Sequence, residues 1–178
     1  MVLSDTLHLL APPDMAPALP EGSSEVSTPT STFGGGPGQD ENPAQWSYQL
    51  TGSGNVSNAV VTVWIEIVDT LFPPAPNPTN PAGSSCAWYV SLALGADSQP
   101  RFACLSEPVG PINPGTKELV FALVGLDAEL EQNETVTLAF GRNAFSPSPE
   151  NSVFVLSGSA EHDSRIELKG LGEPVPDA

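Results

Sequence analysis

The sequence predicts an all-β protein, an antiparallel β-sandwich of about eight or nine strands with long Pro/Gly-rich loops. Two observations carry this prediction. Several runs alternate apolar and other residues with a period of two, the pattern of strands with one buried face. The 20 Pro and 16 Gly residues gather mainly between these runs, where they end strands. No run has a convincing helical period.

The clearest strand covers residues 58–68. Its odd-numbered positions from Ala59 to Ile67 are all apolar, whereas the even-numbered positions are mixed and include Trp64. One face of this strand is therefore expected in the core, and Trp64 is the only tryptophan that alternation does not assign to the core. Trp46 and Trp88 fall on apolar faces of their own strands.

Other strand-like runs follow the same logic. They cover residues 6–10, 45–51, 86–94, 102–104, 117–124, 134–140, 152–157 and 164–169. Residues 11–44 are expected to form a long crossing connection, and residues 171–178 a loose tail. The chain thus predicts one domain over residues 1–178, with an ordered core of about 5–170.

The charge is strongly acidic. The chain has 21 acidic residues, five basic ones and a net charge of −16, and its first basic side chain is Arg101. Such a surface repels phosphate backbones and anionic headgroups, which argues against nucleic-acid and membrane-surface binding. No run is long enough to span a bilayer, so membrane insertion is not expected. Residues 1–13 lack the basic start and apolar run of a secretory signal.

Cys86 and Cys104 occupy comparable positions in consecutive strand-like runs. If these runs form a hairpin with Phe102 and Cys104 facing inward like Cys86, a disulfide can form. The alternative is two free buried thiols. A disulfide indicates an oxidising compartment, hence a secreted or cell-surface protein, with a virion surface as the alternative.

The chain also resembles the jelly-roll modules of the galactose-binding-like and carbohydrate-binding type found in secreted and surface proteins. The resemblance rests on Leu7–Leu9 with its Pro-rich crossing, Val61–Glu66, Leu130–Phe140 and His162–Leu168. It implies a jelly-roll fold in which the first and last strands pair, bringing His8 near residues 161–164. It also implies glycan binding, a structural calcium, or packing against neighbouring proteins.

No catalytic residues are expected. The chain has only two histidines, and in the run His162-Asp163-Ser164 neighbouring strand residues point to opposite faces, so they cannot form a relay. The sequence therefore predicts a non-enzymatic protein.

Two ligand sites remain as hypotheses. Asp127, Glu129 and Glu131 lie close together in a link and could supply oxygen ligands to calcium, or could be solvated acids. Trp64, with Thr62 and Glu66 on the same strand face, could form a platform for a glycan, or could lie under a loop.

The third hypothesis is self-assembly. The segment Thr6-Leu7-His8-Leu9-Leu10 alternates as an edge strand does and precedes a long tether. It can pair with its own sheet or with that of a neighbouring copy. The favoured function is a structural module of an extracellular or particle-surface assembly whose partners are itself or neighbouring surface proteins; a carbohydrate-binding module is the alternative.

Overall fold

The computed structural model of the protein describes residues 5–30, 44–68, 86–95, 99–106, 113–142 and 153–170. Within these ranges every strand ladder is antiparallel, and no helix occurs. The predicted all-β antiparallel sandwich is confirmed. No helix in the described residues is long and apolar enough to cross a membrane.

The strands are numbered in chain order. They are β1 (Thr6–Leu9), β2 (Met15–Ala16), β3 (Val26–Pro29), β4 (Ala44–Gln49), β5 (Gly54–Val56), β6 (Asn58–Ile67), β7 (Cys86–Leu94), β8 (Arg101–Ser106), β9 (Gly115–Leu123), β10 (Ala128–Leu130), β11 (Thr135–Arg142), β12 (Val153–Ser157) and β13 (Arg165–Lys169). The described chain has four strands more than the nine runs predicted: β2, β5 and β10, which are only two or three residues long, and β3. Two of them, β2 and β3, lie in the stretch expected to be a crossing connection. Runs this short carry no readable alternation.

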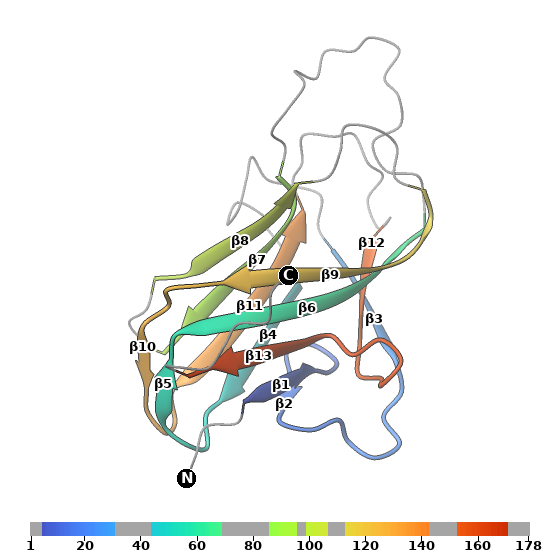
Figure 1. The fold of residues 1–178 in the computed structure, drawn as a ribbon. Helices are drawn as coiled ribbons and strands as arrows, with labels where there is room; N and C mark the ends of the chain where they lie inside the picture. Colours follow the sequence, from blue (N-terminus) through green and yellow to red (C-terminus); the bar gives the residue numbers. More distant parts are fainter. Residues whose placement is uncertain are drawn as a thin grey trace.

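Two sheets form the sandwich in the described residues (Figure 1). The larger sheet has the order β2-β1-β13-β6-β12-β3, with β9 on the other edge of β6. The smaller sheet has the order β4-β11-β7-β8, and β5 pairs with β10 in a separate ribbon. The apolar residues of both inner faces form one core, including Trp46, Trp88, Val61, Leu138 and Phe140.

Strand β6 is the centre of the larger sheet. One edge pairs along its whole length with β9, while the other pairs first with β13 and then with β12. The predicted inward face is confirmed, since Val61, Val63 and Ile65 are fully buried. Thr62, predicted to lie on the outer face, is also only 3% exposed.

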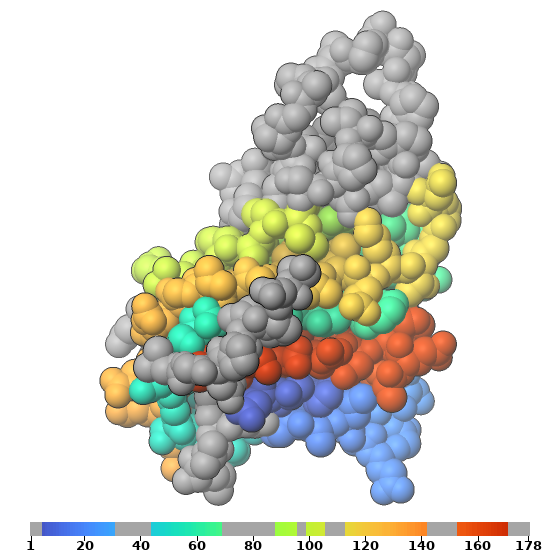
Figure 2. Space-filling model, in the orientation of Figure 1, coloured from blue at the N-terminus to red at the C-terminus, as the bar shows by residue number. Residues whose placement is uncertain are grey.

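The N-terminal strand closes one side of the larger sheet. β1 pairs with β13 of the same chain, with Thr6 opposite Glu167 and His8 opposite Arg165. Figure 2 shows these first and last segments, blue and red, side by side. Leu7 and Leu9 are fully buried. The pairing of first and last strands implied by the jelly-roll resemblance is therefore present.

The alternation of β8 was predicted one residue out of step. Phe102 is 47% exposed and Cys104 is exposed, whereas Ala103 and Leu105 pack against the core. Cys104 lies opposite Tyr89, and Cys86 lies opposite Ser106 beside an irregularity in the ladder. Cys104 carries a free thiol, so the Cys86–Cys104 disulfide is wrong for this structure. The two cysteines are simply not cross-strand partners.

Candidate functional site

Polar and ionisable side chains gather at the loop between β12 and β13, residues 158–164. This loop passes the point where the pairing partner of β6 changes from β13 to β12. It carries His162, Asp163 and Ser164, the three residues whose order resembles a catalytic relay. The structure gives each of them a different partner.

Ser164 fills the junction in the sheet. Its hydroxyl oxygen accepts the backbone N–H of Trp64 at 2.8 Å and donates to the carbonyl oxygen of Leu156 at 2.6 Å. The residue is fully buried. The hydroxyl thus replaces a backbone group in the ladder, and both of its hydrogen-bonding roles are occupied.

His162 lies over the outer face of β6. The centroid of its ring is 5.1 Å from that of Trp64, with the two planes tilted by 55°. Its Nδ1 atom lies 2.5 Å from Oε2 of Glu25, which also accepts a hydrogen bond from the Ser159 hydroxyl at 2.9 Å. The hydrogen bond to His162, aided by that from Ser159, lowers the pKa of the Glu25 carboxyl below its ordinary 4.5. An ionised Glu25 means that His162 Nδ1 carries the donated proton.

His8 forms the second histidine–carboxylate pair. Its Nδ1 atom is 2.6 Å from Oδ1 of Asp163, and the guanidinium of Arg165 is 3.6 Å from the other oxygen of that carboxylate. His8 and Asp163 are about four-fifths buried. The expected proximity of His8 to residues 161–164 is therefore confirmed. This pair ties β1 to the start of β13.

The proposed sugar platform is only partly accessible. Trp64 and Glu66 are half-buried on the outer face of the larger sheet, but Thr62 is buried between Val120 of β9 and Arg165 of β13. One side of the Trp64 ring is in contact with His162. Two of the three predicted residues can thus meet a ligand, and Thr62 cannot.

The predicted calcium ligands are not brought together. Among the described residues no three His, Cys, Asp or Glu side chains form a group that could hold a metal ion. Asp127, Glu129 and Glu131 are all exposed. Glu134, next to them in the sequence, instead accepts the backbone N–H of Glu131 at 2.8 Å. These acids surround a turn, and in the described part of the chain their side chains do not converge as calcium ligands would.

Two members of the loop cluster, Glu25 and Ser159, were not predicted. Glu25 belongs to a Pro/Ser/Thr-rich stretch, and 137 residues separate it from His162. Nothing in the local pattern relates the two, because their contact depends on β3 pairing with β12. Only knowledge of the strand order could have revealed this contact.

Comparison with known proteins finds similar folds among solved structures. No protein-family model matches the chain, and no curated protein matches it. Among solved structures it is similar to a CocE/NonD family hydrolase from Staphylococcus aureus, with a TM-score of 0.53 and 10% identity over 94% of this chain. An α-amino acid ester hydrolase (TM-score 0.50, 12% identity, 93% of this chain) and an aminopeptidase from a Thaumarchaeota archaeon (0.51, 12%, 92%) are also similar.

The chain spans about a third of these structures, 36% of each. At these identities the likeness concerns the fold alone. It supports an all-β domain of a kind that occurs within larger hydrolase chains.

Proposed function

We propose that the protein is a non-enzymatic structural module: a β-sandwich that works by contact with neighbouring proteins or domains in an extracellular or particle-surface assembly. The observation that carries this proposal is that the side chains of Ser164, His8 and His162 are engaged in contacts within the fold. Ser164 is buried and saturated with hydrogen bonds, and His8 and His162 each bind a carboxylate that ties one strand or loop to another. Such groups stabilise the fold and are not presented to a substrate.

The structural comparisons support a modular role. The same type of domain makes up about a third of several larger chains. A sandwich of this kind offers broad outer faces to neighbours. Here those faces include large apolar side chains that are about half exposed or more, Val68, Phe102, Val120 and Val124.

The proposed placement outside the cell has lost the support of a disulfide, because Cys104 is free. With a net charge of −16, the protein is well suited to stay soluble and to avoid nucleic acids. Neighbouring surface proteins, or further copies of the chain, are the proposed partners. If β1 were exchanged between copies, it would make with β13 of a neighbouring copy the same contacts that it makes with β13 of its own chain. This exchange stays a prediction.

Solution mass tests the assembly proposal. Light scattering at increasing protein concentration, with and without calcium, should reveal species larger than one chain. A protein that stays monomeric under all conditions would contradict the self-assembly hypothesis. The proposed partners would then be other proteins only. Added calcium is expected to change nothing in the described acidic turn, because no three ligands converge there.

Glycan binding is the second candidate function. It is favoured by one observation, the half-buried Trp64 beside Glu66 on an outer face. Glycan-array signal that disappears on Trp64→Ala, with an unchanged far-ultraviolet spectrum, would establish this role. Signal that survives the substitution would remove Trp64 as the platform.

A further inference from the structure

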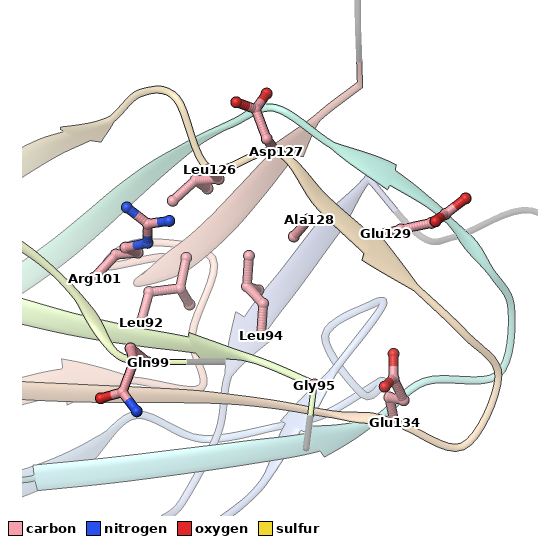
Figure 3. Close-up of a pocket in the computed structure, with 10 residues that line it drawn as sticks. All are labelled: Leu92, Leu94, Gly95, Gln99, Arg101, Leu126, Asp127, Ala128, Glu129 and Glu134. Atoms are coloured by element: carbon pink, nitrogen blue, oxygen red, sulfur yellow. The ribbon is translucent and has the colours of Figure 1, made fainter. Parts of the chain in front are cut away.

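A pocket of about 480 Å³ lies at the end of the sandwich where β7 and β8 face the link from β9 to β10 (Figure 3). Leu92 and Leu94 of β7 form its floor, and Leu126 and Ala128 stand opposite. Leu92 is fully buried within this floor, whereas Leu94 keeps 6% of its surface exposed. This volume falls within the range of roughly 300–1,000 Å³ that small-molecule sites occupy. The pocket is separate from the loop at 158–164.

A positive charge marks one end of the pocket. Arg101 of β8 lies directly opposite Leu92 in the β7–β8 ladder. In a chain with 21 acids and only five bases, it is notable that Arg101 forms no ion pair with any described residue. Its guanidinium is therefore available to a carboxylate supplied from outside.

A negative charge marks the other end. The carboxylate of Glu134 lies over Gly95, so closely that a Cβ atom built on this glycine would be 3.1 Å from Oε1. Gly95 has a φ of +78°, which also favours glycine there. The carboxylate is held by the Glu131 N–H through Oε2. Glu134 is thus a positioned anion with a second oxygen to offer.

The two charges are separated by the apolar floor. Gly95 is three residues beyond Leu92, which corresponds to about 10 Å along an extended strand. Asp127 and Glu129 line the rim and make the pocket negative as a whole. A simple anion is therefore repelled, and a ligand that approaches Arg101 must also carry a positive charge.

We propose that this pocket binds a small zwitterion with an apolar centre, its carboxylate on Arg101 and its ammonium on Glu134. A tripeptide with free ends is the simplest example, since three extended residues span about 10 Å. The central side chain would lie on Leu94 and Ala128, the apolar lining residues that keep some exposed surface. This inference goes beyond the proposed structural role and does not depend on it.

Glycyl-leucyl-glycine is the probe, with its N-acetylated and C-amidated forms as controls. Backbone amide shifts of Leu92, Arg101 and Ala128 in titrations monitored by NMR report binding. The free tripeptide should bind most tightly. The amidated form, which keeps only the ammonium, should bind better than the acetylated form, because the pocket is negative.

Charge-removing variants test each end separately. Arg101→Gln should weaken binding of the free tripeptide roughly tenfold. It should not weaken binding of the amidated form, whose ammonium is repelled less once the guanidinium is gone. Glu134→Gln should weaken binding of the free and amidated forms. It should not weaken binding of the acetylated form, which is repelled less once this carboxylate is gone. Lys169→Gln and Glu118→Gln make the same charge changes elsewhere and should have no effect. Absence of shifts at millimolar peptide, or equal binding by all variants, would overturn the proposal.

Discussion

Nδ1 of His8 lies 2.6 Å from Oδ1 of Asp163, although 155 residues separate them in the sequence. The pair joins the first strand of the larger sheet to the last, and it is mostly buried. The residues that follow them, Leu9 and Ser164, are also joined, because the N–H of Leu9 donates to the carbonyl oxygen of Ser164 at 2.9 Å. The closure of the sandwich by its own N-terminus therefore rests on side-chain as well as backbone contacts.

Loss of this pair should loosen β1. Asp163→Asn removes the charge and leaves His8 with a weaker partner, which should cost about 1 kcal/mol of unfolding free energy. Urea unfolding followed by tryptophan fluorescence measures the change. Glu161→Gln, a neutralisation of an exposed acid in the same loop, is the matched control and should be nearly silent. Equal effects of the two variants would mean that the pair contributes nothing.

Ser164→Ala should be more costly than its small change in volume suggests. It leaves the Trp64 N–H and the Leu156 carbonyl without their bridging hydroxyl inside the sheet. Unsatisfied buried groups cost about 1–3 kcal/mol. Ser27→Ala, at an exposed position of β3, makes the same chemical change without this loss. Equal denaturation midpoints for both variants would contradict the bridging role.

Glu25 should make stability depend on acid pH. Its folded pKa is lower than its ordinary 4.5, so its stabilising contribution is complete above about pH 4.5 and disappears as the pH falls through the folded value. The urea midpoint of unfolding, measured between about pH 3 and pH 6, should depend less on pH in Glu25→Gln than in the parent protein. Glu21→Gln, four positions away and exposed, controls for net charge. A parent-like slope in Glu25→Gln would refute the assignment.

Cys104 should react readily in the folded protein. Its thiol is free and exposed on β8. A thiol reagent added to the native, unreduced protein should label Cys104, and Cys104→Ser should lower the number of labelled thiols by one. If the native parent protein fails to react until it is reduced, the disulfide expected from the sequence exists after all.

The sequence predicted the elements that depend on local alternation. Buried Val61 and Val63 on β6, and the core tryptophans Trp46 and Trp88, follow directly from a period of two. The orientation of β8 was wrong because a turn of unknown length separates it from β7, and a shift of one residue exchanges the faces of a strand. The expected disulfide also failed on register, because Cys86 lies opposite Ser106, two residues from Cys104.

The candidate sites were harder to predict for a different reason. The acidic residues at 127–131 looked like ligands because they are close in sequence, yet their side chains do not converge. Conversely, Glu25 contacts His162, and Arg101 and Glu134 line one pocket, because of the order of strands in the sheets. Strand order depends on long-range packing and leaves no local pattern.

Pairing of β1 with β13 within one chain is the central claim, and a cross-link tests it most directly. Thr6 and Glu167 lie opposite each other, in a position where neighbouring strands bring Cα atoms to about 4.5 Å. Thr6→Cys with Glu167→Cys, in a protein whose Cys86 and Cys104 are serine, should oxidise to a disulfide-closed monomer on a non-reducing gel. Covalent dimers or longer chains that disappear on reduction would show that β1 is exchanged between copies.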